Sequence, residues 1–258
     1  MQRVAPPPRT IVTGASGRVA RLLRAVWGET VEWRSRAGGD PLADLPEGGS
    51  LLCLAGIVPG AGDLAENARI ARKTLDAAGR VGLRRVLLMS SAAVYPVGER
   101  LTEAQAAPFS DYGRAKLAME TEAQGADVET CCLRLGNLAG ADALLGRLTR
   151  ADPVLDVFAD GRVPRRSYIG PVSLANALAR LLTLPQPLPP VLNLAAPGVV
   201  GMDELLSAAG RAWISRPAPE TAIPVIGLDT AALRALVPIG DDDGDPAEIV
   251  RQWRQVRP

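Results

Sequence analysis

The sequence predicts an α/β fold, a doubly wound parallel sheet with helices on both faces. Short apolar runs are typical of fully buried strands, stretches with helical spacing alternate with them, and small or polar residues follow the runs directly. Ligands of such sheets bind beyond the carboxyl ends of the strands. We therefore expect the site among the residues at these ends, which are Gly14, Ser35, Ala55, Ser91 and Gly136.

The first element is the apolar run Thr10–Thr13, which stops at a glycine turn. A helix follows, because Val19, Leu22 and Val26 recur at helical spacing and Gly28 is a suitable helix end. The same criteria predict further strands at 30–34, 51–55, 85–89, 128–135 and 191–195, and further helices at 63–79, 111–125 and 172–184. After Gly140 the pattern loosens, and 201–258 is expected to form short helices joined by loops.

Composition excludes several classes of protein. The chain has 258 residues, a formal net charge of +1 and scattered arginines, which argues against a nucleic-acid partner. It contains no histidine, so Ser-His-Asp machinery and imidazole-based zinc sites are excluded. We expect no metal site, and we interpret the acidic run Asp241–Asp243 as a solvated loop.

The sequence indicates a cytoplasmic protein. Cys53, Cys131 and Cys132 lie inside apolar runs without metal-ligand spacing, which predicts buried thiols in a reducing compartment. No apolar stretch is long enough for a membrane span, so we expect no membrane partner. Residues 1–8 lack the apolar core of a secretion signal.

Tyr112 and Lys116 form the most informative pair in the sequence. Because they are four residues apart on an expected helix, they lie on one face and can act at a common spot. A nearby ammonium favours the phenolate, so we expect Lys116 to lower the pKa of Tyr112 and make it a proton donor or acceptor near neutral pH. The alternative is an ordinary polar pair on an exposed helix.

The turn after the first strand reads Thr-Gly-Ala-Ser-Gly-Arg-Val-Ala from Thr13 to Ala20. Gly14 permits a tight turn, Gly17 permits close approach of a diphosphate, and Ala20 permits close packing of helix against strand. The diphosphate would rest on the helix N-terminus. The turn therefore predicts dinucleotide binding, with a plain strand–helix connection as the alternative.

The end of the second strand favours NADP(H) over NAD(H). It reads Arg34-Ser35-Arg36, without the acid that binds the adenosine ribose hydroxyls in NAD sites. Ser35 leaves room for a 2′-phosphate, and Arg36, with Arg18 or Arg34, supplies positive charge.

Ser90 and Ser91 end the fourth strand, which brings a hydroxyl within reach of the helix that carries Tyr112. Such a hydroxyl can hydrogen-bond both a substrate oxygen and the tyrosine. The alternative is a strand end with turn serines.

Together these motifs resemble the extended short-chain dehydrogenase/reductase superfamily, and within it the NAD-dependent epimerase/dehydratase family. The resemblance extends from about Thr10 to Leu206. The matching pieces are the Thr-Gly-x-x-Gly-x-x-Ala turn, Leu54-Ala55-Gly56, Asn67, Ser90-Ser91-x-x-Val-Tyr95, Tyr112-x-x-x-Lys116, Leu133-Arg134-Leu135-Gly136-Asn137, Leu192-Asn193-Leu194 and Glu204-Leu205-Leu206.

The resemblance implies a role for each matched residue. Tyr112 is the expected catalytic acid/base, Lys116 supports it and holds the nicotinamide ribose, and Ser91 occupies the catalytic Ser/Thr position. The expected cofactor-binding residues are Gly14, Ser16, Gly17, Arg18, Val19, Ser35, Arg36, Leu54, Ala55, Gly56, Asn67, Ser90, Tyr112 and Lys116. The expected substrate-binding residues are Ser91, Asn137 and Arg166, the last two by their match to positions that touch nucleotide phosphates in some members.

The resemblance also implies a Rossmann-like domain, 1–140 and 163–197, with a small substrate-capping region, 141–162 and 198–258. A homodimer through the helices at 63–79 and 111–125 is expected on the same ground. The chain departs from the family pattern at Cys53, where many members have histidine, and near Ser173, where an acid is usual.

The expected function is hydride transfer at an alcohol or carbonyl carbon of a small-molecule substrate, either a sugar nucleotide or a small carbonyl compound. Reduction and epimerisation share this machinery, and the sequence does not choose between them. Dehydration is disfavoured because Ala92 and Ala93 stand where its additional acid–base pair is usual. The alternative function is a non-catalytic NADP(H)-binding sensor, which has no need of a tuned tyrosine.

Overall fold

The computed structural model describes residues 5–149 and 151–256. Within these residues the core of the fold is a six-stranded parallel sheet in the order β11-β6-β4-β3-β1-β2. The strands are β1 (Thr10–Thr13), β2 (Glu32–Arg34), β3 (Ser50–Cys53), β4 (Arg85–Ser91), β6 (Thr130–Leu135) and β11 (Val191–Leu194). The doubly wound α/β fold expected from the sequence is confirmed.

The strand order changes direction at β1. This strand pairs in parallel with both β2 and β3, so the carboxyl ends of β1 and β3 are neighbours. A crevice for ligands is expected at such a switch point. The chain passes from β2 to β3 through the turn η1 (Arg36–Gly38) and the segment 39–49, all of it described and without a helix or strand after η1.

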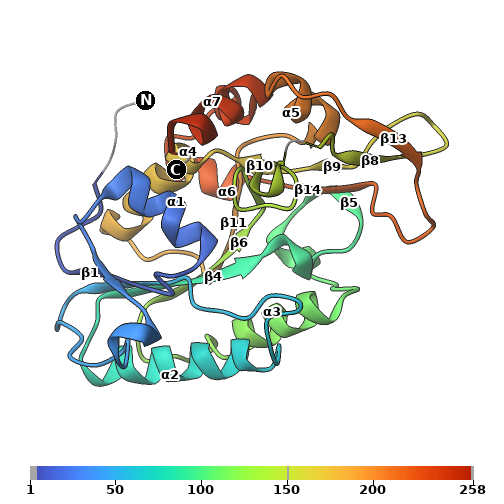
Figure 1. Ribbon diagram of the computed structural model, residues 1–258. Coiled ribbons are helices and arrows are strands. Elements are labelled where there is room, and N and C mark those ends of the chain that lie inside the picture. Colours follow the sequence, from blue (N-terminus) through green and yellow to red (C-terminus); the bar gives the residue numbers. More distant parts are fainter. Residues whose placement is uncertain (1–4, 150, 257–258) are drawn as a thin grey trace.

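Helices cover both faces of the sheet (Figure 1). α2 (Glu66–Arg80) and α3 (Asp111–Thr121) lie on one face, and α1 (Arg18–Trp27) and α4 (Pro171–Thr183) lie on the other. The hydroxyl of Ser110 accepts a hydrogen bond from the backbone N–H of Gly113 at 3.0 Å, which fixes the start of α3. By fixing the first residue of α3, this cap fixes which of its side chains face the strand ends.

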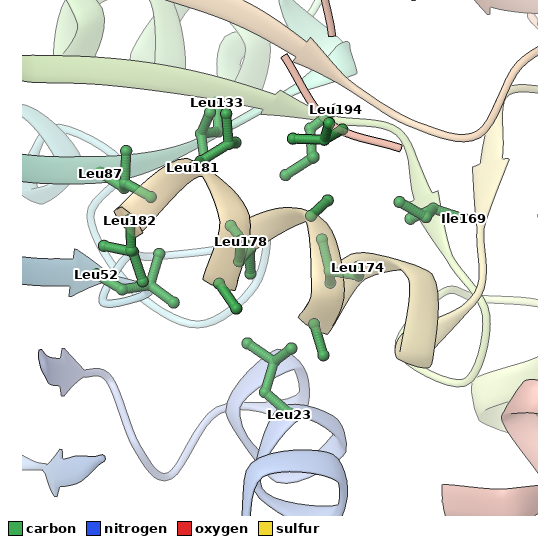
Figure 2. Packing of buried hydrophobic residues seen from close by; sticks show 14 of the residues in the cluster. Leu23, Leu52, Leu87, Leu133, Ile169, Leu174, Leu178, Leu181, Leu182 and Leu194 are labelled. Atoms are coloured by element: carbon green, nitrogen blue, oxygen red, sulfur yellow. The ribbon is translucent and has the colours of Figure 1, made fainter. Parts of the chain in front are cut away.

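The main core lies between the sheet and α4. Leu174, Leu178, Leu181 and Leu182 of α4 pack among leucines of the strands and of α1, as Figure 2 shows. The leucines contributed by those elements are Leu23, Leu52, Leu87, Leu133 and Leu194. Each fully buried leucine stabilises the fold by roughly 1.5–3 kcal/mol, so this layer fixes the sheet on which the site is built.

Small sheets lie at the carboxyl edge of the main sheet, and most of their strands come from the carboxyl half of the chain (Figure 1). Their strands are β5 (Gly98–Leu101), β7 (Asn137–Leu138), β8 (Val154–Val157), β9 (Arg165–Arg166), β10 (Tyr168–Ile169), β12 (Val200–Gly201), β13 (Ile214–Pro217) and β14 (Val225–Leu228). The helices of this half are α5 (Met202–Ala208), α6 (Ala231–Arg234) and α7 (Pro246–Val256). The sequence predicted the short helices, but it did not predict β13 and β14.

The acidic run belongs to the turn η5 (Asp241–Gly244). Asp241 pairs with Arg234 at 3.1 Å, and Asp243 accepts a hydrogen bond from the hydroxyl of Ser173. The run is therefore more than a solvated loop, because Asp243 supplies an acid beside Ser173 from a distant part of the chain. Among the described residues no cluster of side chains is suited to a metal ion, and no helix is long and apolar enough to cross a membrane.

Candidate active site

A first cavity of about 350 Å³ opens at the carboxyl ends of β1 and β3. Gly14 follows β1 with a φ of +78°, and a Cβ atom there would lie 2.5 Å from the backbone nitrogen of Ala55. Only glycine allows this backbone path next to the end of β3. The expected cofactor residues that line this cavity are Gly14, Ser16, Gly17, Ser35, Arg36, Leu54, Ala55 and Gly56.

The residues of this cavity fit a dinucleotide. Gly17 is the N-cap of α1 and brings no side chain to the helix N-terminus, so the N–H groups of the first turn stay available to a diphosphate. A Cβ atom on Gly56 would lie 2.8 Å from Asn67 Oδ1 and 3.1 Å from Lys116 Nζ. The loop at Gly56 therefore leaves no room for a side chain between the cavity and Lys116.

Positive charge is present where the second strand ends. Ser35 and Arg36 line the cavity, and Lys73 of α2 lies on the same lining with the acidic Asp40 and Glu66. Arg34 does not line it, because its guanidinium donates to the carbonyl oxygens of the 41–44 turn. Of the arginines proposed for a 2′-phosphate, Arg36 is thus the one that the structure places at this cavity.

A second cavity of about 360 Å³ holds the proposed catalytic residues. Ser91 at the end of β4 and Tyr112 and Lys116 of α3 line it together. Further expected site residues on its wall are Val19, Leu54, Gly56, Ser90 and Asn137. Leu54, Gly56 and Ile57 line both cavities, so the dinucleotide crevice continues directly into the site of Tyr112.

Burial raises the pKa of Tyr112, while a hydrogen bond with Ser91 and the positive charge of Arg18 lower it. The net direction is upward, which differs from the expectation that Lys116 would lower this pKa. The ammonium of Lys116 lies 6.0 Å from the centroid of the tyrosine ring and donates instead to the carbonyl oxygen of Met89 at 3.0 Å. Ser91 and Arg18 are therefore the groups that favour the phenolate in this structure.

Lys116 is 5% exposed, and burial lowers its pKa. Thiols close to it, Cys53 and Cys132, and the carboxylate of Glu120 act in the opposite direction. All three cysteines are free and buried in β3 and β6, as the sequence predicted. The position of Lys116 beside Gly56 and Met89 places its charge between the strand ends and the loop that both cavities share.

Ser90 belongs to a buried polar network instead of offering a free hydroxyl to the cavity. It donates to Glu120 at 2.5 Å, and Glu120 also pairs with Arg134 at 2.7 Å. Arg134 donates to the hydroxyl of Tyr95 at 2.9 Å, and Tyr95 donates to Asn193 at 2.6 Å. Glu120 and the matched family positions Ser90, Tyr95, Arg134 and Asn193 thus join β4, α3, β6 and β11 behind the proposed catalytic residues.

Two expected cofactor residues do not line either cavity. Asn67 is buried, and its side chain accepts from the N–H of Ile57 at 3.1 Å and donates to the carbonyl oxygens of Ile57 and Leu64 at 3.0 Å. Through these hydrogen bonds Asn67 holds the loop at Gly56 in shape without lining either cavity. Arg18 is exposed at the first position of α1, and its charge acts on Tyr112.

The two residues expected at a substrate phosphate are separated. Asn137 of β7 lines the catalytic cavity, whereas Arg166 of β9 does not. The guanidinium of Arg166 donates to the carbonyl oxygens of Arg165 at 2.7 Å, Ile223 at 2.9 Å and Pro224 at 3.4 Å. This differs from the expectation, because the segment before β14 binds the guanidinium that was expected to face the substrate.

Asp142 lines the catalytic cavity and was missed from the sequence. Its carboxylate accepts from the hydroxyl of Tyr168 at 3.0 Å and from the backbone N–H groups of Gly140 at 3.3 Å and Gly146 at 3.1 Å. Burial raises its pKa, and the hydrogen bonds from Gly146 and Tyr168 act against that shift. The available signal was a single acid in the otherwise apolar and glycine stretch 138–145.

Comparison with known proteins links the site to a family. A family model described as the NAD dependent epimerase/dehydratase family matches residues 57–183, which include Ser91, Tyr112 and Lys116. No significant match was found among curated proteins.

Solved structures with a similar fold match nearly the whole chain. A short-chain dehydrogenase/reductase superfamily protein from Agrobacterium tumefaciens with bound NAD is 18% identical, with 96% of each chain covered and a TM-score of 0.75. A UDP-glucuronic acid 4-epimerase from Bacillus cereus, in complex with UDP-glucuronic acid and NAD, is 14% identical, covers 96% of this chain and 98% of that chain, and has a TM-score of 0.74. A Bordetella bronchiseptica enzyme in complex with NAD and UDP is 17% identical, covers 96% of this chain and 94% of that chain, and has a TM-score of 0.74. These likenesses establish the shared fold.

Proposed function

We propose that the chain, in which a model of the NAD dependent epimerase/dehydratase family matches residues 57–183, is an NADP(H)-dependent enzyme that transfers hydride at an alcohol or carbonyl carbon. The observation that supports this most directly is the continuous wall of Leu54, Gly56 and Ile57. It connects a dinucleotide crevice to a cavity that Ser91, Tyr112 and Lys116 line together. Net reduction and epimerisation both use such a site, and the substrate is a sugar nucleotide or a small carbonyl compound.

In the proposed mechanism Tyr112 is the acid/base. Its hydroxyl gives a proton to the carbonyl oxygen during reduction and takes it back during oxidation. Ser91, which is hydrogen-bonded to Tyr112, polarises the same oxygen. The buried ammonium of Lys116 provides positive charge at the loop that both cavities share, and it would hold the nicotinamide ribose when the cofactor is bound. When bound, the nicotinamide supplies or accepts the hydride, which no side chain of this chain can do.

The preference for NADP(H) over NAD(H) is supported by Ser35 and Arg36, which line the dinucleotide crevice at the end of β2. No acid occupies the end of the strand, and a serine with an arginine suits a 2′-phosphate. The three solved structures described above contain NAD, so the preference is a property of this chain's own residues and is measured by comparing dissociation constants for NADPH and NADH.

The substitution Tyr112→Phe tests the mechanism. It removes the acid/base hydroxyl and keeps the ring, so turnover should fall by about 10²–10⁴-fold while the affinity for NADPH is unchanged. A screen of aldehydes, ketones and keto-sugars by NADPH oxidation, with epimerisation of sugar nucleotides alongside, identifies the substrate with which turnover is measured. Unchanged turnover in Tyr112→Phe would contradict the mechanism. A wild-type protein that binds NADPH and turns over none of these substrates would instead be a sensor.

A further inference from the structure

The wall of the catalytic cavity is mostly apolar. Val19, Leu54, Met89, Leu135 and Leu138 contribute to it. Two of its polar groups are already engaged, because Ser90 donates to Glu120 at 2.5 Å and Lys116 donates to Met89 at 3.0 Å. The other polar side chains on this wall are the proposed catalytic residues Ser91 and Tyr112, together with Asn137 and Asp142.

The cavity offers little positive charge to the diphosphate of a sugar nucleotide. Diphosphates are typically held by arginine forks or by lysine. In the part of the chain that the structure describes, Lys116 is the only cationic side chain on this cavity. Arg166 is bound by backbone carbonyl oxygens at Ile223 and Pro224, and Arg165 pairs with Glu99 at 2.7 Å.

Asp142 adds a carboxylate to the same wall, and its hydrogen bonds act against the rise in pKa that burial causes. Its carboxylate accepts from the hydroxyl of Tyr168 and from backbone N–H groups of Gly140, Leu144 and Gly146. Four donors suit the ionised carboxylate, which has only acceptors. Tyr168 is 1% exposed and also shares a side-chain hydrogen bond with Asn137, so both polar residues of this wall are held in place. A substrate anion beside Asp142 would meet like charge in a poorly solvated site.

The size of the cavity also favours a small substrate. Its volume of about 360 Å³ lies near the lower end of the range of ligand pockets, about 300–1,000 Å³. Because Tyr112 and Lys116 line this cavity, a nicotinamide that reacts there shares the space with the substrate.

We infer that the substrate is a small uncharged carbonyl or alcohol compound with a largely apolar body, and that Asp142 excludes anionic substrates. This rests on the proposed function, because it names the substrate class of the same cavity. It separates this chain from the sugar-nucleotide complexes that share its fold. The test therefore includes binding measurements that do not depend on turnover.

The first measurement compares nucleotides with an uncharged ligand on the wild-type protein saturated with NADP(H). Titration calorimetry with UDP and with UDP-glucose should give no binding at concentrations up to about 1 mM. Saturation-transfer NMR should show benzyl alcohol bound, and 4-(hydroxymethyl)benzoate, which adds one carboxylate, bound at least about tenfold more weakly. A dissociation constant below about 100 µM for either nucleotide would overturn the inference, as would the absence of a signal from benzyl alcohol.

The second measurement uses turnover with a matched pair of aldehydes. Benzaldehyde should be reduced with a kcat/KM at least about tenfold higher than 4-carboxybenzaldehyde. Asp142→Asn keeps one acceptor oxygen for the loop and removes the charge, so it should narrow this ratio to about twofold. Asn137→Asp places a second carboxylate on the wall and should widen the ratio. A ratio that neither substitution changes would overturn the role of Asp142.

The two proposals fail in different ways. Suppose that Tyr112→Phe kept full turnover and that benzyl alcohol still bound more tightly than 4-(hydroxymethyl)benzoate. The mechanism would then be wrong and the substrate class would stand. If UDP-glucose bound and was turned over by a Tyr112-dependent reaction, the mechanism would stand and the substrate class would be wrong. Melting temperatures of both wall variants, measured beside the wild type, show whether the loop remains folded.

Discussion

Glu120 of α3 and Arg134 of β6 form a buried ion pair, with 2.7 Å between carboxylate oxygen and guanidinium nitrogen. The same carboxylate accepts from Ser90 at 2.5 Å, and Arg134 also donates to the carbonyl oxygen of Glu103 at 2.7 Å. The pair therefore fastens the helix that carries Tyr112 to β6, and the hydrogen bond from Ser90 fastens it to the end of β4 next to Ser91. Geometry at Tyr112 depends on this attachment, although neither charge touches the cavity.

Removing one partner of this pair should be strongly destabilising. Glu120→Gln leaves the guanidinium of Arg134 buried without its counter-charge, and such changes cost about 3–5 kcal/mol. Urea unfolding measures the loss. The matched control is Glu122→Gln at the C-cap of the same helix. Its partner Arg72 is 60% exposed at a distance of 2.6 Å, so this substitution should leave stability unchanged. Equal effects of the two substitutions would mean that the buried pair contributes little.

Ser91 should set the pH dependence of the reaction as well as its rate. Its hydrogen bond lowers the pKa of Tyr112, which burial has raised, so Ser91→Ala should raise that pKa further. Oxidation of an alcohol requires the phenolate, so its kcat/KM rises with pH through the pKa of Tyr112. In Ser91→Ala this rising limb of the pH profile should move to higher pH. Reduction requires the protonated tyrosine and should extend to higher pH.

Arg18→Gln is the control for this shift. It removes a charge that lowers the pKa of Tyr112 without removing the Ser91 hydroxyl. The limb should again move to higher pH, now with little change in the maximal rate. Profiles of kcat/KM against pH for the three proteins decide the matter, and a limb that moves to lower pH in either variant would contradict it.

Cofactor preference should reverse on a single substitution at the end of β2. Ser35→Asp places a carboxylate where a 2′-phosphate is proposed, so the ratio of NADPH to NADH affinity should fall by about 10²-fold. Arg36→Gln should weaken NADPH by about tenfold and leave NADH unchanged, because it removes only the counter-charge. Dissociation constants from fluorescence titration check both changes. If Ser35→Asp left the ratio of NADPH to NADH affinity unchanged, the 2′ position of the adenosine ribose would not lie beside Ser35.

Gly14→Ala should abolish dinucleotide binding. The substitution puts a Cβ atom 2.5 Å from the nitrogen of Ala55 and a side chain on a residue with φ +78°, so the turn must change shape. Strain of this kind costs about 1–3 kcal/mol. Gly240→Ala is the control, since a Cβ atom there meets nothing within 4 Å. Retained NADPH affinity in Gly14→Ala, measured by titration, would contradict the assigned crevice.

The inner strands of the central sheet could be predicted from the sequence because they are apolar on both faces, whereas the edge strand β2 was predicted from its alternation of apolar and polar residues. Strand β1 begins and ends where the sequence predicted, and the expected run 85–89 extends by two residues to Ser91 in β4. The glycine turn and the pair Tyr112 and Lys116 were recognisable for a similar reason, since their spacing follows from local geometry.

The rest depended on contacts between distant parts of the chain. Strand β14 pairs with both β5 and β9, and no local pattern in Val225–Leu228 announces these partners. The direction of the pKa shift of Tyr112 follows from how deeply α3 packs, which spacing alone does not give. Arg166 was expected at the substrate, but backbone oxygens more than fifty residues away bind it. Asp142 faces the cavity only because Tyr168 holds its loop there.

The direct passage from β2 to β3 makes β2 an outer edge of the described sheet. Exposed edges invite pairing with strands of other molecules, and short, charged strands discourage it. β2 is three residues long, and Arg34 in it pairs with Glu32 at 2.7 Å while its guanidinium holds the following 41–44 turn. Arg34 thus places charge on the open edge of the sheet, which disfavours pairing with another strand there, and the same side chain shapes the turn that follows.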